Sequence, residues 1–228
     1  MRSRQRADIG LNGWHGADIG PDGAAFVTEG LLEGTQIATP EGWRAVERLS
    51  PGDRLLTFDG GPQSVIAVQS AQVEAGHTAW PQAHWPLDVP DGALGNRGVL
   101  RLLPCQPVLL ESDLAEDMFG DPFALVPAAA LEGWRGIARA APRPQETAHI
   151  LILPTDAVIY AAGHALVYCP ADSSAGLPGF GEDRAGYVPL SLATAREFVA
   201  CLIAEDIGAA LRGAAPDGSQ AAFRALSP

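Results

Sequence analysis

The segment 34–53 constrains the fold more than any other part of the chain. It reads as a short strand, a turn at Glu41-Gly42, and a second short strand. The sequence Ser50-Pro51-Gly52-Asp53 then predicts a tight turn, because proline fixes the backbone for a turn corner and glycine accepts the reversed conformation that follows it. Two short strands with such turns predict an antiparallel hairpin at the start of a β domain.

Short strand-like runs continue through most of the chain. They are rich in Val, Ile, Leu and Thr and recur at intervals of about 8–12 residues, with Gly, Pro and Asp between them. This pattern predicts a compact, mainly all-β fold. Residues 70–91, rich in Pro, His and Trp, are predicted to be a loop. The predicted strands cover residues 54–58, 63–69, 98–103, 108–110, 121–126, 128–131, 147–153 and 157–161.

The chain changes character after Pro170. A loop rich in Gly, Ser and Pro precedes one predicted amphipathic helix, about 195–212. Thr194 and Glu197 form a capping box at its start, and Gly213 is a plausible stop. The apolar stripe of this helix is expected to pack on the β domain, and binding a partner is the alternative. The stripe comprises Val199, Leu202, Ile203, Ile207, Ala210 and Leu211.

These patterns divide the chain into three parts. Residues 1–25, rich in Gly and Asp, are expected to form a flexible N-terminal arm. Residues 26–170 form the β domain. Residues 171–228 hold the loop and the C-terminal helix.

Charge and composition exclude several classes of function. All 15 basic residues are arginine, and 27 acidic residues bring the net charge to −12. So acidic a chain is expected to bind neither nucleic acid nor anionic lipid. No apolar run approaches the roughly 18 residues of a membrane span. The basic N-terminus lacks the apolar segment of a signal peptide, so a cytoplasmic protein, or one exported without a classical signal, is expected.

The cysteine and histidine residues predict neither a disulfide framework nor a metal-binding motif. Cys105, Cys169 and Cys201 are odd in number and widely spaced, which predicts buried thiols rather than disulfides. The residues His77, His84, Asp88 and Asp91 were weighed as a metal site, but their spacing fits no common ligand pattern. A solvated loop is the preferred interpretation. The glycine-rich segments lack the strand-to-helix setting of a phosphate site, so no cofactor is predicted.

The opening segment resembles the first hairpin of the Hint domain, the self-processing fold of hedgehog proteins and inteins, and most closely a bacterial Hint subfamily. The resemblance spans about 30–170 in the right order and spacing. It implies a flattened disc of short strands with two pseudo-symmetric halves, here around 34–66 and 103–137. Further segments that carry it are Asp91-Gly92-Ala93-Leu94-Gly95, residues 102–110, residues 119–131, and the strand pair at 147–153 and 157–163.

The resemblance also implies where the family's chemistry would lie. A nucleophilic cysteine precedes the Gly-Thr pair by four residues, and here that position is Gly30. The family's Ser/Thr-x-x-His positions fall on Leu103 and Gln106, and its late histidine falls on Thr155. Leucine cannot hydrogen-bond, and glutamine cannot transfer a proton near neutral pH. Only His149 aligns with a histidine of the subfamily, and a structural role in a strand is the preferred interpretation.

Two other side chains remain as weak substitutes for the missing nucleophile, Thr28 and Cys105. The sequence therefore predicts a degenerate, non-catalytic Hint-fold module with a scaffold or interaction role and an unknown protein partner. The alternative is an autoprocessing protein that uses a non-standard nucleophile. A hydrolase acting on other molecules is a more distant third hypothesis.

Overall fold

The predicted opening hairpin is formed by β4 (Gln36–Thr39) and β5 (Gly42–Ala45), which pair antiparallel. It belongs to a computed structural model that describes residues 17–19, 25–73, 81–171 and 187–213. Gly34, which has a φ of +89°, donates its N–H to Glu47 Oε2 at 2.9 Å. The Thr35 hydroxyl donates to the Leu32 carbonyl at 2.6 Å. These bonds fix the entry to the hairpin and explain the Gly-Thr pair.

The turn that follows the hairpin is closed by Asp53. Its N–H donates to the Ser50 carbonyl at 3.0 Å, and its carboxylate accepts the Ser50 N–H at 2.9 Å. Gly52 supplies the required positive φ of +95°. Arg44 of β5 forms an ion pair with Asp53 at 2.8 Å. The local sequence thus specified both this turn and its attachment to the hairpin.

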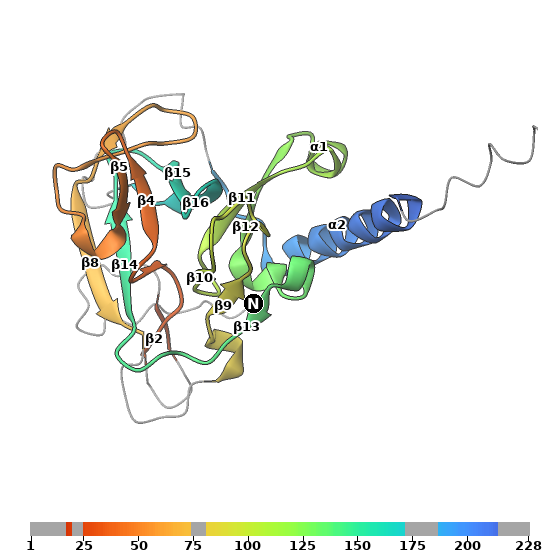
Figure 1. Cartoon of the computed structure of the whole chain (residues 1–228), viewed down its shortest axis with the longest axis horizontal. Helices are drawn as coiled ribbons and strands as arrows, with labels where there is room; N and C mark the ends of the chain where they lie inside the picture. The colour runs from red at the N-terminus through yellow and green to blue at the C-terminus, as the bar shows by residue number, and fades with distance from the viewer. Residues whose placement is uncertain (1–16, 20–24, 74–80, 172–186, 214–228) are drawn as a thin grey trace, which may run out of the picture.

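Most strands belong to two six-stranded antiparallel sheets, seen in Figure 1. In sheet I, strands from distant parts of the chain lie side by side, and β14 pairs with both β3 and β8. The order in sheet I is β13 (Ala138–Arg139), β9 (Leu87–Val89), β10 (Leu100–Leu102), β3 (Leu31–Leu32), β14 (Thr147–Ile152) and β8 (Ala67–Gln72). The order in sheet II is β12 (Phe123–Pro127), β11 (Pro107–Glu111), β16 (Ala165–Cys169), β15 (Ala157–Ala161), β4 and β5.

Two small strand pairs and four 3-10 helices complete the β domain. The arm predicted for residues 1–25 holds the described strand β1, which pairs with β2. The pairs are β1 (Ala17–Ile19) with β2 (Ala25–Val27), and β6 (Arg54–Leu55) with β7 (Gln63–Ser64). The 3-10 helices are η1 (Val46–Arg48), η2 (Gln82–His84), η3 (Ala128–Leu131) and η4 (Trp134–Gly136).

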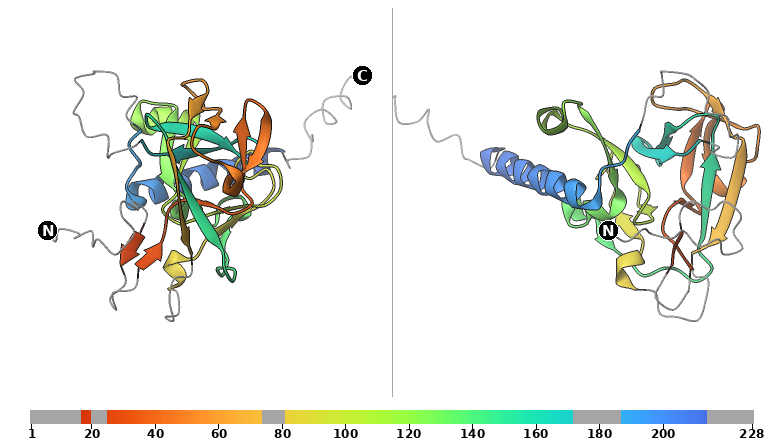
Figure 2. Two further views of the ribbon diagram at one scale, coloured as in Figure 1. Left: turned by 90° about the vertical axis from the view of Figure 1, so that its left-hand side faces the viewer. Right: turned by 180° about the vertical axis from the view of Figure 1, so that it is seen from behind.

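The C-terminal helix α2 (Leu192–Gly213) buries apolar side chains on the β domain only in its first half. Phe198 is fully buried and Leu202 is 7% exposed, whereas Ile207 and Leu211 are 56% and 69% exposed. The second half therefore projects away from the strands, as Figures 1 and 2 show. The predicted stripe packs as expected only in its first part. No helix in the described residues is long and apolar enough to span a membrane.

The helix begins earlier than predicted. Ser191 is its cap, because the Ser191 hydroxyl accepts the Thr194 N–H at 3.1 Å and its carbonyl accepts the Ala195 N–H at 2.8 Å. Thr194 is therefore inside the first turn, and the predicted capping box at Thr194 is wrong. Two serine or threonine residues three positions apart made the cap ambiguous in the sequence.

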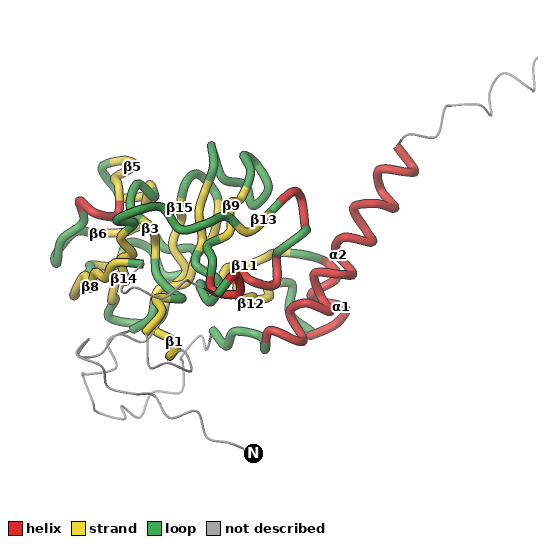
Figure 3. The backbone as a smooth tube through the Cα atoms, turned by 90° about the horizontal axis from the view of Figure 1, so that it is seen from below, coloured by secondary structure: helices red, strands yellow, loops and turns green. Residues whose placement is uncertain are grey.

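Several other elements differ from the prediction. Residues 113–119, for which no element was predicted, form a short helix α1 (Asp113–Phe119), capped by Ser112 and ended by Gly120 at a φ of +79°. Residues 128–131, predicted as a strand, form η3. The predicted loop 70–91 contains the end of β8, then η2 and β9, within its described part. Strand β16 was not predicted. Figure 3 shows α1 near the start of α2, at the end of the β domain from which α2 departs. The structure is otherwise mainly antiparallel β with a C-terminal helix, which confirms the predicted fold class.

Candidate functional site

The candidate site is centred on Gly30, which lies just before β3 and is buried. Its φ of +122° is a conformation that residues with a side chain rarely adopt. A Cβ atom at this position would lie 3.2 Å from the His149 carbonyl oxygen and 3.4 Å from Cβ of Ala148. The position that the resemblance assigns to the nucleophile is therefore closed to a side chain by both its backbone conformation and its neighbours.

Gln106 faces Gly30 from the start of β11. The Gly30 N–H donates to Gln106 Oε1 at 3.1 Å. The other end of the same amide donates from Nε2 to the Tyr168 carbonyl at 2.9 Å and to the Pro107 carbonyl at 3.2 Å. Because all three partners have fixed donor or acceptor character, the amide has one consistent orientation. Gln106 is 2% exposed and joins the segment before β3 to β16.

His149 lies on β14 opposite Leu31, one residue beyond Gly30. Its Nδ1 is 2.8 Å from the Ser70 hydroxyl, and its Nε2 is buried without a hydrogen-bond partner among the described residues. Burial lowers the pKa of His149 from its ordinary value, and the carboxylates of Glu47 and Glu33 partly oppose this shift. The imidazole is therefore neutral near pH 7.

Gly30, Gln106 and His149 meet around a small cavity of about 10 Å³. A cavity needs about 10–15 Å³ to hold one water molecule. The cavity is therefore about the size of one water molecule. The remaining lining residues are Glu29, Leu31, Ile150, Leu151, Tyr168, Cys169 and Pro170.

Leu103 and Thr155 lie away from this cavity. Leu103 is fully buried in a small apolar cluster with Val27 and Leu32, so its position has become part of the packing. Thr155 is exposed in the turn after β14, and its hydroxyl bonds Gln63 Oε1 at 3.2 Å. Of the residues that the resemblance assigned to the family's site, the structure thus brings together Gly30, Gln106 and His149.

The two substitute candidates lie beside the same segment. The Cys105 N–H donates to the Thr28 carbonyl at 2.7 Å, which places Cys105 next to the two residues that precede Gly30. Thr28 is buried, whereas Cys105 is exposed. The prediction of buried thiols is therefore wrong for Cys105 and Cys201, which are both exposed, and correct for Cys169.

The carboxylates weighed as metal ligands have structural roles. Asp88 pairs with the buried Arg101 at 3.0 Å, and Asp91 Oδ1 accepts the Gly98 N–H at 2.7 Å. Within the described residues, no three His, Cys, Asp or Glu side chains are grouped as a metal site. His77 lies outside the described residues.

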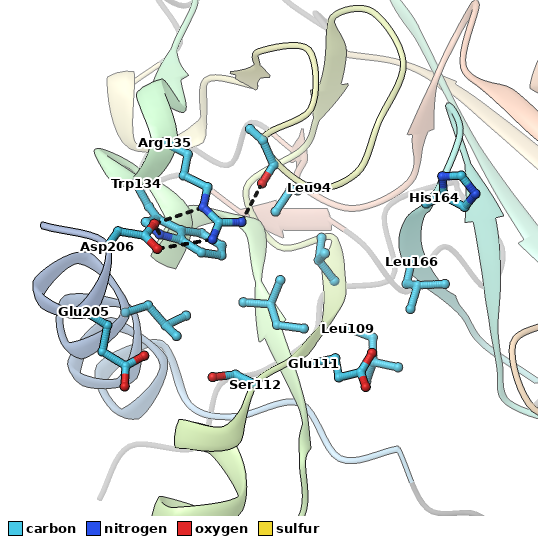
Figure 4. A pocket seen from close by; sticks show the side chains of 14 residues that line it. Leu94, Leu109, Glu111, Ser112, Trp134, Arg135, His164, Leu166, Glu205 and Asp206 are labelled. Atoms are coloured by element: carbon cyan, nitrogen blue, oxygen red, sulfur yellow. Dashed lines mark hydrogen bonds and ion pairs between the residues drawn. The ribbon is translucent and has the colours of Figure 1, made fainter. Parts of the chain in front are cut away.

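A larger cavity of about 330 Å³ lies where α2 meets the β domain, as drawn in Figure 4. On one wall, Asp206 of α2 accepts hydrogen bonds from Arg135 at 3.0 and 3.3 Å and from Trp134 Nε1 at 2.9 Å. The Arg135 guanidinium also lies 4.3 Å from the centre of the Trp134 ring. These charged groups satisfy one another, so the wall serves to attach the helix.

Sequence reasoning missed Tyr168 and Cys169, which complete the walls of the small cavity. Both lie on β16, the strand that was not predicted. Burial, followed by the nearby Asp156 carboxylate, raises the pKa of Tyr168, and burial raises that of Cys169. Both groups therefore stay protonated at neutral pH. The apolar run 165–169 after Gly163 was the signal that could have revealed the strand.

Comparison with solved structures finds inteins and an intein-like domain. A bacterial intein-like domain from Clostridium thermocellum is 14% identical, with a TM-score of 0.44, and the match covers 61% of this chain and 98% of that one. The MchDnaB-1 intein is 15% identical, with a TM-score of 0.37, and the match covers 60% of this chain and 98% of that one. Comparison with curated protein sequences finds no match.

A family model gives the assignment. The model of the Hint domain matches residues 30–166, which is more than half of the chain. The match includes Gly30, Gln106 and His149 and ends within β16. This chain therefore belongs to the Hint domain family.

Proposed function

We propose that this chain is a Hint-fold module that does not cleave itself and acts as a scaffold or interaction protein. The hydrogen bond from the Gly30 N–H to Gln106 Oε1 carries the proposal. Self-cleavage before residue 30 requires protonation of that amide nitrogen as it leaves. Here the group that faces the nitrogen is an amide oxygen, which accepts a hydrogen bond and has no proton to give.

The geometry around Gly30 also disfavours a nucleophilic side chain at this position. A cysteine there would need a φ that is unfavourable for any residue with a Cβ, and it would press against the carbonyl of His149. The small cavity beside it is about the size of one water molecule. Leu103, in an apolar cluster, offers no hydroxyl to polarise the carbonyl before Gly30.

Position 149 holds a histidine, but the nucleophilic side chain that cleavage needs is missing at position 30. It is neutral at pH 7, so it could accept a proton. However, the residue that would have to be deprotonated at position 30 has no side chain. A structural role is the better interpretation: its Nδ1 bonds Ser70 and connects β14 with the neighbouring strand β8.

Intact-mass spectrometry of the full chain tests the proposal. We expect a single species at the mass of the uncut chain, before and after incubation with a thiol or hydroxylamine, which cleave thioesters and esters. An intein that retains its cysteine serves as the positive control. A pair of fragments divided near residues 29 and 30 would overturn the proposal.

The alternative, autoprocessing by a non-standard nucleophile, is favoured by one observation. Cys105 is exposed, and its own N–H bonds the Thr28 carbonyl. In this alternative, the Cys105 thiolate attacks that carbonyl carbon, the bond to the Glu29 nitrogen breaks with protonation of the new amine, and water hydrolyses the thioester. Fragments divided between residues 28 and 29 that disappear in Cys105→Ser but persist in Cys201→Ser would establish it.

A further inference from the structure

Sheet II carries apolar side chains on both of its faces. On β11, Val108 and Leu110 point into the main core, so Leu109 between them points to the opposite face. Leu109, Leu125 and Val158 form a separate buried cluster there. We call this group, with the side chains that pack against it, the outer cluster. The added side chains are Phe58, Phe123, Leu166, Tyr168 and Tyr187.

A cavity of about 440 Å³ opens on the outer cluster. This volume lies within the range of small-ligand sites, about 300–1,000 Å³. Its floor is Leu109 and Leu125, and three aromatic rings stand around it: Phe58, Phe123 and Tyr187. The Phe58 and Phe123 rings meet edge to face with centroids 5.2 Å apart, which holds both rings in place.

Val188 and two carboxylates complete the lining of this cavity, and both carboxylates are exposed. Asp59 accepts a hydrogen bond from the Tyr187 hydroxyl, and Asp121 Oδ1 accepts the Phe123 N–H at 2.9 Å. Each carboxylate is thus attached to one aromatic residue of the wall. Burial, followed by the Asp59 carboxylate, raises the pKa of Tyr187, so the phenol remains the donor.

The described part of the chain supplies no positive charge to the lining of the cavity. Among the described residues that line it, none is arginine or histidine. The ion pairs of the described residues use other carboxylates than Asp59 and Asp121, and the chain as a whole has a net charge of −12. Aromatic faces beside uncompensated carboxylates form an environment that attracts an organic cation, since ring faces and carboxylates both interact favourably with positive charge.

We propose that this cavity binds an alkylammonium group, held by the faces of Phe58, Phe123 and Tyr187 and by the charges of Asp59 and Asp121. The site is separate from Gly30 and does not depend on whether the chain cleaves itself. The group could belong to a small amine or to a methylated lysine side chain. The chemistry of recognition is the same for both.

The test compares a cation with its neutral isostere on the unmodified chain. Choline and 3,3-dimethylbutan-1-ol have nearly the same shape and differ in charge. Titration followed by NMR or calorimetry at low salt is expected to show choline binding at least about tenfold more tightly. The preference should shrink at high salt, because exposed carboxylates are screened. Equal affinity for the two compounds, or no saturable binding of choline, would overturn the proposal.

Conservative variants locate the site. Asp59→Asn and Asp121→Asn keep an oxygen acceptor for their present partners and remove the charge. We expect each to weaken choline binding by about three- to tenfold. Phe58→Leu keeps apolar bulk and removes a ring face, with a similar expected loss. Glu41→Gln, an exposed carboxylate on the β4–β5 turn, is the matched control. Choline binding that is as strong in all three cavity variants as in the control would exclude this cavity.

A second arm identifies the source of the cation. A short peptide with trimethyllysine is compared with the same peptide carrying a neutral tert-butyl analogue. A preference for the cationic peptide larger than that shown by choline assigns the site to a protein side chain, and a smaller one assigns it to a free amine. Peptides bound equally, together with equal binding of the choline pair, would again overturn the proposal.

Discussion

Replacing Gly30 with alanine perturbs the closed site at its centre. The φ of +122° costs a residue with a Cβ about 1–3 kcal/mol. The new methyl group would also lie 3.2 Å from the His149 carbonyl oxygen and 3.4 Å from Ile150 Cγ1. Both neighbours belong to β14, which is paired on each side and cannot easily move, so overpacking adds about 1–3 kcal/mol. We expect Gly30→Ala to reduce the free energy of unfolding by about 2–6 kcal/mol.

Gly42→Ala is the matched control for this experiment. Gly42 has a nearly identical φ of +116°, but an added Cβ would meet no atom within 4 Å. It should therefore lose only the backbone contribution, about 1–3 kcal/mol. Urea unfolding of the two variants measures the difference directly. Equal losses would show that the surroundings of Gly30 accommodate a side chain, and would refute the argument that the site is closed to a nucleophile.

Three further perturbations test other parts of the structure. Gln106→Leu leaves the Gly30 N–H and the Tyr168 carbonyl buried and unpaired, so urea unfolding should show a loss of about 2–5 kcal/mol and hydrogen exchange at the Gly30 amide should accelerate. Burial lowers the folded-state pKa of His149 below its unfolded value near 6.5, so the unfolded chain binds that proton more readily than the folded chain. The contribution of His149 to the free energy of unfolding should therefore be full above pH 6.5 and decline as the pH falls below it. His149→Gln should flatten this part of the stability profile measured against pH. Phe198→Ala should cost about 3–5 kcal/mol in thermal unfolding, whereas Leu211→Ala on the projecting half of α2 should stay within about 0.5 kcal/mol; similar losses would mean that α2 is packed along its whole length.

The sequence revealed those parts of the fold that local chemistry determines. The opening hairpin and the turn at Asp53 follow from glycine, proline and aspartate at fixed positions, and both are as predicted. Helix α1 was missed, although Ser112 and Gly120 are an ordinary cap and stop, because only seven residues separate them and so short a segment shows no helical periodicity. The aromatic cavity could not be predicted, since residues around 58, 123 and 187 meet only when sheet II is assembled.

The arrangement of the candidate site could not be predicted from local sequence either. From the sequence, Gly30 is a missing side chain and Gln106 a missing proton donor, and the two losses look independent. In the structure they are a single arrangement, because the Gln106 amide occupies the position from which Gly30 could be protonated. The close approach of β14 to Gly30 depends on a pairing between residues more than a hundred positions apart in the chain. No local sequence pattern could predict this close approach.

The same arrangement shows what placing the family's histidine at position 106 and cysteine at position 30 would require. A histidine at position 106 could replace two of the three contacts of glutamine, accepting the Gly30 N–H with one ring nitrogen and donating to the Tyr168 carbonyl with the other. In its neutral form the accepting nitrogen carries no proton, so this histidine would stabilise the planar amide, and only its imidazolium form could protonate the Gly30 nitrogen. A cysteine at position 30 would in addition require β14 to move away from the chain. If the chain does not cleave itself, as we propose, restoring cleavage at residue 30 would require the backbone around Gly30 to change together with both side chains.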